Sequence, residues 1–248
     1  MGTAIFPKWM NSLPVVGGVL GMGATAFLVA GVTYYFTPEF WRVGYEPIQP
    51  VDYSHQLHAG TLGIDCRYCH THVEESFHAN VPDTGTCMNC HTGVGEQSFL
   101  NASLWNGTNK VGHRDNPNLI TVRESYASGT PIQWKRVHKV PDYAHFNHSV
   151  HLHAGVSCYS CHGRIDQMAV VRVEHGMGMA WCLRCHRNPK NNLVDVDGVL
   201  ADGEGPVRVT DLATVQSLVS DSDQQMRGLE LAAHKGLQPP QNCGACHY

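Results

Sequence analysis

Charged side chains are scarce in this sequence. Asp, Glu, Lys and Arg make up 15% of its 248 residues, and the formal net charge is −4. Proteins that bind nucleic acid normally carry a basic surface, so this balance argues against that class of partner. Long amphipathic patterns are also scarce, whereas glycine (25 residues) and proline (13) are plentiful. The composition therefore favours short helices and extended loops over a conventional helical or sheet protein.

Cysteine is absent outside a single motif. All ten cysteines lie in five copies of C-x-x-C-H, numbered motif 1 to motif 5 in chain order. This spacing is typical of covalent c-type haem attachment, in which two thiols form thioethers and the adjacent histidine binds the iron. We therefore predict five haem c groups. The thioether residues are Cys66, Cys69, Cys87, Cys90, Cys158, Cys161, Cys182, Cys185, Cys243 and Cys246, and the proximal iron ligands are His70, His91, His162, His186 and His247.

Zinc binding and disulfide bonds are the alternatives for these cysteines. Zinc also uses C-x-x-C pairs, but it does not require a histidine directly after each pair. Five disulfides in an oxidising compartment would not explain five pairs at the same spacing. Covalent haem accounts for both features.

Residues 13–36 contain no charged side chain. A membrane-spanning helix needs about 20 mostly apolar residues, so this run predicts one N-terminal crossing. A cleaved signal peptide remains open, with Ala24-Thr25-Ala26 as a small-x-small exit site, but its apolar region is typically about 7–15 residues. The run continues well beyond that site. We therefore expect residues 1–45 to form a retained membrane anchor.

The flanks of this run predict its orientation. Lys8 is the only basic residue before it, which places the N-terminus in the cytoplasm. Aromatic residues at the far end would form an interfacial belt; they are Tyr34, Tyr35, Phe40 and Trp41. Residues 46–248 would then form an extracytoplasmic (periplasmic) domain on the inner membrane, the side on which thioether-linked haem is attached.

The same run is rich in glycine. Gly17 and Gly21 form a small-x-x-x-small pair that Thr25 continues. Such a face lets another helix approach closely, although glycine is common in membrane helices in general. The functional interpretation is contact with an integral membrane partner.

An internal repeat divides the predicted haem domain. Tyr53-Ser-His55-Gln-Leu-His58 precedes motif 1, and Phe146-Asn-His148-Ser-Val-His151 precedes motif 3. Each block is followed by two motifs, so we expect two dihaem modules at about 50–95 and 143–190. A linker (96–142) would join them, and a tail (191–248) would carry motif 5. With roughly forty residues for each haem, the porphyrins must supply much of the buried apolar surface. The predicted fold class is an irregular, mostly α multihaem cytochrome wrapped around its haems.

The tail contains one longer helical pattern. Residues 211–234 predict a helix that is capped by Thr210 or Asp211 and stopped at Gly236.

The repeat also supplies candidates for the sixth iron position. His55, His58, His148 and His151 are the first candidates, because one histidine of each pair can serve its own haem and the other a neighbour. His138 and His78 come next. Bis-His ligation is typical of low-spin electron transfer.

Motif 4 is approached differently, through His175-Gly-Met177-Gly-Met179-Ala-Trp181. Met179 lies three residues before Cys182, where a short turn would bring its thioether over the ring. Methionine is more often a flexible apolar filler. We nevertheless expect Met179 as the distal ligand of this haem, with a raised potential.

These residues carry a family resemblance. The F-x-H-x-x-H block resembles class III multihaem cytochromes. Longer strings resemble the pentahaem cytochrome of alternative complex III, the bacterial quinol:electron-acceptor oxidoreductase. The strings are YSHQLHAG (53–60), DCRYCHT (65–71), VPDTGTCMNCH (81–91), RVHKVPDY (136–143), FNHSVH (146–151), CYSCHGRIDQM (158–168) and WCLRCHRNP (181–189). The segment between Arg187 and Cys243 matches poorly.

The resemblance implies an electron-relay subunit that does not itself oxidise quinol. It implies a soluble electron acceptor and three kinds of partner, namely integral membrane quinol-binding subunits, an iron–sulfur subunit and a monohaem cytochrome c subunit. The main alternative is a membrane-anchored multihaem quinol dehydrogenase feeding a periplasmic reductase. A reductase enzyme with one open iron is a third possibility, and the twelve histidines outside the motifs argue against it.

The motif count generates the first prediction. Intact-mass analysis of the purified chain should show five covalent haems, and the pyridine haemochrome spectrum should give the same number. Bound zinc, free thiols or disulfides at these positions would contradict the haem assignment.

Overall fold

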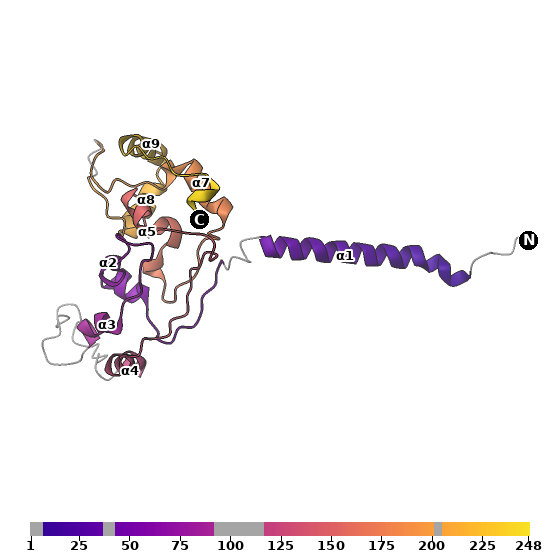
Figure 1. The fold of residues 1–248 in the computed structure, drawn as a ribbon, viewed down its shortest axis with the longest axis horizontal. Helices are drawn as coiled ribbons and strands as arrows, with labels where there is room; N and C mark the ends of the chain where they lie inside the picture. Colours follow the sequence, from indigo (N-terminus) through magenta and orange to yellow (C-terminus); the bar gives the residue numbers. More distant parts are fainter. Residues whose placement is uncertain (1–6, 37–42, 92–116, 201–204) are drawn as a thin grey trace, which may run out of the picture.

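The computed structural model describes residues 7–36, 43–91, 117–200 and 205–248. Over these ranges the chain is helical and irregular, and its β pairing is an isolated bridge between Val156 and Leu193. A long N-terminal helix precedes the short ones (Figure 1). The predicted irregular, mostly α architecture with one N-terminal apolar helix is therefore confirmed for the described residues.

Helix α1 (Leu13–Phe36) follows a 3₁₀ turn at Lys8–Ser12 and projects away from the other helices (Figure 1). It is long and apolar enough to cross a membrane, a property that an N-terminal signal sequence shares. The predicted interfacial residues Phe40 and Trp41 lie outside the described residues. None of the 18-residue window that qualifies α1 as a candidate span is buried against the rest of the chain, so its side chains are open to another partner.

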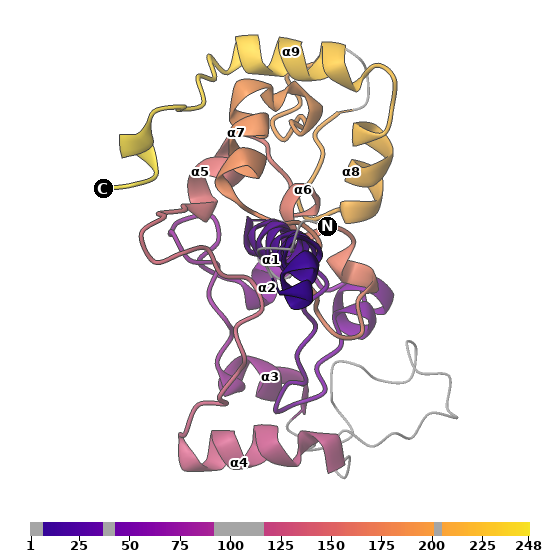
Figure 2. The ribbon, with the colours of Figure 1, turned by 90° about the vertical axis from the view of Figure 1, so that its right-hand side faces the viewer.

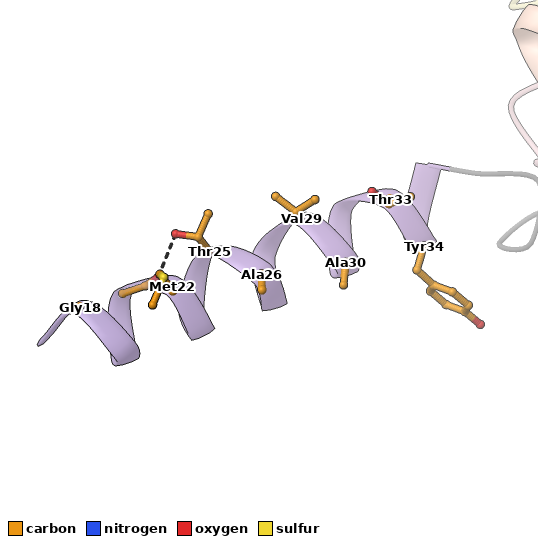
Figure 3. Close-up of a pocket in the computed structure, with 9 residues that line it drawn as sticks. Gly18, Met22, Thr25, Ala26, Val29, Ala30, Thr33 and Tyr34 are labelled. Atoms are coloured by element: carbon orange, nitrogen blue, oxygen red, sulfur yellow. Dashed lines mark hydrogen bonds between the residues drawn. The ribbon is translucent and has the colours of Figure 1, made fainter. Parts of the chain in front are cut away.

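One side of α1 carries a shallow groove that is lined mostly by small residues. Figure 3 shows Thr25, Val29 and Thr33 along one edge of this side and Ala26 and Ala30 along another. The Thr25 hydroxyl donates to the Gly21 carbonyl at 2.9 Å, which satisfies it inside the helix. A side chain added at Gly17 or Gly21 would meet nothing in the described part of this chain within 4 Å.

The remaining α-helices are short. Asp65 caps the first by accepting from the Arg67 N–H at 2.9 Å, and Asn147 caps another by accepting from the Ser149 N–H at 2.9 Å. The sequence thus begins helices directly at motif 1 and at the second H-x-x-H block. The helices are α2 (Cys66–Cys69), α3 (Thr84–His91), α4 (Ile120–Ser128), α5 (His148–His153), α6 (Tyr159–His162), α7 (Met179–Arg187), α8 (Leu212–Val219) and α9 (Gln224–His234).

The C-terminal tail corrects one sequence expectation. The pattern over 211–234 predicts a single helix, but the structure contains two, α8 and α9, separated at 220–223. Asp211 caps α8 as expected, and Gly236 follows α9 with φ of 59°. The break occurs at Ser220-Asp-Ser-Asp223, whose side chains bond to nearby backbone groups and compete with the helix.

Two small hydrophobic clusters lie toward opposite ends of the part of the chain that follows α1 (Figure 2). One joins Val51, Met88 and Val122 near α3 and α4. The other joins Val194, Val209 and Val215 around α8. Helix α2, which carries motif 1, lies between these clusters (Figure 2), whereas Tyr159 of α6 packs against the second cluster. Within the described ranges, side chains alone therefore build no continuous core through the motif region.

The tail packs on the chain after motif 4 through a close backbone approach. Gln224 donates to the carbonyls of Lys190 (3.1 Å) and Leu193 (2.8 Å). Beside it, a Cβ added at Gly228 would overlap the Lys190 carbonyl. Residue 228 must be glycine because there is no room for a Cβ atom, and not because of its backbone angles.

This contact generates the second prediction. Gly228→Ala should lower the free energy of unfolding of the haem-loaded chain by about 1–3 kcal/mol, because the methyl group forces α9 away from 189–191. Thermal unfolding followed by far-UV circular dichroism measures this. The control is Glu230→Ala on the exposed face of α9, which should have little effect. Equal stabilities of the two variants would contradict the packing argument.

Candidate haem-attachment sites

Each motif is built on one tight turn. In motifs 1, 3 and 5 the histidine N–H donates to the carbonyl of the first cysteine at 2.9 Å. Motifs 2 and 4 lie within α3 and α7. Cysteines three apart on such a turn share one face, and the histidine follows on the same side. The turn therefore presents two thiols and one imidazole together.

None of the ten cysteines forms a disulfide. Within the described ranges, no group of three or more His, Cys, Asp and Glu side chains is arranged to hold a metal ion.

Backbone carbonyls orient three proximal histidines. The Nδ1 atom lies 2.6 Å from the Asn80 carbonyl in His70, 2.6 Å from the Pro240 carbonyl in His186, and 2.8 Å from the Tyr143 carbonyl in His247. A carbonyl can only accept, so Nδ1 carries the proton. The neutral ring then presents Nε2 as a free lone pair. This is the tautomer that an iron-binding histidine needs.

The candidate distal histidines follow the same pattern. His58, His148 and His151 donate from Nδ1 to the carbonyls of residues 54, 77 and 147 at 2.8, 2.7 and 2.7 Å. His55 differs, because its buried Nδ1 has no hydrogen-bond partner among the described residues. An unsatisfied buried polar atom in a native protein is often explained by a bound group.

Ring separations show which histidines face one another. Two imidazoles that share one iron have ring centroids roughly 6 Å apart, since each nitrogen lies about 2 Å from the metal. Three pairs meet this expectation. They are His55–His70 (6.5 Å, with planes 4° apart), His58–His91 (6.2 Å) and His151–His186 (6.1 Å). The residues at motifs 1, 2 and 4 therefore fit haem binding with histidine on both faces.

Motif 3 has a different arrangement. His138 packs edge-on against His162 at 4.4 Å, too close for an iron between the ring centres. The contact joins His138 Nε2 to His162 Nδ1 at 3.4 Å, and Nδ1 is the nitrogen that faces a carbonyl in motifs 1, 4 and 5. In the described structure His138 thus occupies the position of that carbonyl.

Burial keeps these imidazoles neutral. Desolvation, followed by nearby histidines, lowers the pKa of His162 to about 3 and of His55 to about 4. Burial likewise lowers the pKa of His138 to about 4, and it lowers the pKa values of His148 and His151. Metal ligation requires the deprotonated nitrogen, so this environment favours the ligating form.

Met179 and His78, which were also predicted as distal ligands, lie outside these pairs. Met179 is the first residue of α7 and is 69% exposed. His151, not Met179, faces the proximal histidine of motif 4. His78 is exposed and lies near His148, whose pKa is lowered by burial and then, in smaller part, by the charge of His78.

Motif 5 differs from the others in its surroundings. Cys243 and His247 are exposed, and the ring of Tyr143 packs on His247 at 5.9 Å. The His145 N–H donates to the Cys246 carbonyl at 2.8 Å, while its ring stacks on Tyr248. Residues 143–145 therefore hold motif 5 against the second module.

Thiol contacts show that motif 1 adjoins two other motifs. The Cys66 and Cys158 thiols lie next to each other, and their interaction lowers the pKa of Cys66 and raises that of Cys158. The pKa of Cys69 is raised by burial and then by the charge of Cys87. Motif 1 thus lies between motif 2 and motif 3.

Further contacts extend the series toward the C-terminus. Burial and then the charges of Cys185 and Cys182 raise the pKa of Cys161 to about 12. Burial and then the charge of Cys246 raise the pKa of Cys182. Motif 3 therefore adjoins motif 4, and motif 4 adjoins motif 5. The order in space is 2–1–3–4–5, which Figure 2 shows as the succession α3, α2, α6, α7 and C-terminus.

Sequence reasoning did not find the carbonyl acceptors of the proximal histidines. Asn80, Tyr143 and Pro240 lie 10 to 104 positions from the rings they orient. Every residue has a carbonyl, so no residue type marks this role. Asn80 is the exception, because asparagine tolerates a left-handed backbone and its residue type therefore hints at an unusual turn.

No protein-family model matches the chain. The chain is similar to the menaquinone reductase, multiheme cytochrome c subunit, of Nitratidesulfovibrio vulgaris strain Hildenborough, with 29% identity over 114 residues. This chain is a distant relative of a multihaem cytochrome c. The match covers 46% of this chain and 45% of the length of that relative. The relationship implies covalently bound haem c, whereas the number five rests on the motifs.

The geometry at motif 4 generates the third prediction. His151→Ala should open one iron and produce a high-spin signal in the electron paramagnetic resonance spectrum. Met179→Ala is the comparison, and it should keep the spectrum low-spin, because His151 lies at the iron-spanning distance. The reverse result, high-spin iron in the Met179 variant alone, would assign the ligand to the thioether.

Proposed function

We propose that the chain is a membrane-anchored pentahaem c-type cytochrome that relays electrons within a quinol-oxidising complex. In this proposal the complex is alternative complex III and the electrons leave toward a soluble extracytoplasmic acceptor. The observation that carries the relay is the arrangement of the motifs: motif 1 adjoins motifs 2 and 3, motif 3 adjoins motif 4, and motif 4 adjoins motif 5. The complex itself is proposed from the resemblance of the motif strings.

The chain's own residues would hold the haems in three ways. The ten motif cysteines would bind them covalently, and the five motif histidines would each supply one iron ligand. His55, His58 and His151 would supply a second histidine ligand at motifs 1, 2 and 4, and His148 is the candidate for motif 3. When bound, haem supplies one-electron iron chemistry, and the protein sets its potential through ligands, hydrogen bonds and burial.

The single-file order suits a relay because each haem then has at most two neighbours. An electron entering at one end passes every haem before leaving at the other. Motif 2 and motif 5 are the two ends, and the exposed position of motif 5 suits exchange with a partner. The chain relays electrons in this account and is not catalytic alone.

A second candidate differs in the direction of transfer. The curated relative is named as part of a menaquinone reductase, which suggests electrons that flow toward quinone. The motif order serves either direction equally. The potentials of the two terminal haems would set the preference.

Purification of the native complex tests the proposal. The complex is isolated from membranes through a tag on this chain, and its subunits are identified by mass spectrometry. A quinol analogue should then reduce the haems, with integral membrane and iron–sulfur subunits present. Haem reduction by a soluble donor, with quinol ineffective, would favour the reverse direction. Absence of any membrane partner would overturn the proposed complex.

The anchor generates the fourth prediction. The double substitution Gly17→Leu and Gly21→Leu adds bulk on the face where we propose that another helix approaches closely. Partner subunits should therefore dissociate in detergent, while the haem content of this chain stays normal. The matched control is Gly23→Leu, since residue 23 lies about 200° around the helix from Gly21. Size-exclusion chromatography measures the outcome. Intact complexes in both variants would contradict the docking face.

A further inference from the structure

Asn80 has an unusual backbone. Its φ is 68°, and Met177 (38°) is the other described non-glycine residue with positive φ. This left-handed region costs an L-residue roughly 1–2 kcal/mol, although asparagine visits it more readily than most residues. A conformation of this kind persists only where the surroundings require it.

The left-handed turn directs a carbonyl at a proximal histidine. The Asn80 carbonyl accepts from His70 Nδ1 at 2.6 Å, ten residues after the motif. The Asn80 side chain points elsewhere, with its amide nitrogen 3.2 Å from His72 Nδ1. The backbone, and not the amide, therefore contacts the ligand.

The corresponding acceptors at motifs 4 and 5 need no such turn. Pro240 and Tyr143 supply carbonyls at 2.6 and 2.8 Å from ordinary backbone angles. Among these three motifs, motif 1 alone obtains its acceptor from a residue with a positive φ angle, which most side chains disfavour. A substitution at residue 80 can therefore weaken this hydrogen bond by changing the backbone angles. A side-chain substitution otherwise leaves a backbone carbonyl in place.

We propose that Asn80 is a positioning residue that lowers the reduction potential of the haem at motif 1. This inference rests on the proposed function, because it requires His70 to ligate iron. A strong Nδ1–H···O=C bond makes the imidazole a stronger donor to iron. A stronger donor stabilises ferric iron more than ferrous iron and so lowers the potential.

The position of motif 1 gives this tuning a consequence. Motif 1 lies between motifs 2 and 3, so electrons that travel along the file pass through its haem. A change in its potential alone would alter transfer along the whole file. Asn80 therefore acts on the relay through one hydrogen bond.

A graded substitution series at Asn80 tests the inference. Glycine keeps φ positive without cost, alanine incurs the left-handed penalty, and valine incurs a larger one because it is β-branched. In potentiometric titrations of the holoprotein, Asn80→Gly should leave all midpoints unchanged. Asn80→Ala and Asn80→Val should raise one midpoint progressively. A tenfold change in the oxidised-to-reduced ratio at fixed potential corresponds to about 59 mV for a one-electron couple.

Two controls separate this role from others. His72→Ala removes the partner of the Asn80 side chain and should move no midpoint. Where Asn80→Val fails to mature, Asn80→Ala and Asn80→Gly still give the comparison. An equal shift in the glycine and valine variants, or no shift in alanine with full haem content, would overturn the proposal.

Counting haems in the same samples distinguishes a failure of the proposed function from a failure of the proposed role of Asn80. Fewer than five haems in the unmodified chain would refute the proposed function. Five haems with unchanged midpoints across the series would refute only the role of Asn80.

Discussion

The hydrogen bond from a histidine Nδ1 to a backbone carbonyl is the interaction on which the haem domain depends. It fixes the tautomer, aims Nε2 away from the backbone, and ties several of the rings to segments far along the chain. His186 is joined to Pro240, and His247 to Tyr143. His148 is joined to Phe77. These bonds orient the imidazole rings and connect distant segments of the chain at the same time.

This arrangement explains how so little protein can organise so many motifs. The two hydrophobic clusters are small and separated, and the helices between them are mostly one or two turns long. Helices of that length are not stable alone in water. Each is held by the caps, carbonyl contacts and thiol neighbours of its motif. Structure and ligand orientation are therefore supplied by the same residues.

Local chemistry was predictable from the sequence. The charge-free run predicted the long apolar helix α1, and Asp211 was one of two predicted caps for the helix that begins at Leu212. The aromatic-x-His-x-x-His repeat singled out His55, His58 and His151, which the structure brings opposite proximal histidines. What could not be predicted depends on distant segments meeting. The facing of His151 and His186 and the contact of His138 with His162 are set by tertiary packing, for which no local pattern exists. The break between α8 and α9 was missed because four short polar side chains outweighed helical periodicity.

The central claim is that the haem sites form one unbranched file in the order 2–1–3–4–5. Locating the irons in the haem-loaded protein, by anomalous diffraction at the iron edge, tests it most directly. We expect the motif 1 iron to have the irons of motifs 2 and 3 as its nearest neighbours, and the motif 5 iron to have a single near neighbour, at motif 4. The claim would be contradicted if the motif 2 iron lay closer to the motif 3 iron than to the motif 1 iron. It would also be contradicted if the nearest iron to motif 5 were any other than that of motif 4.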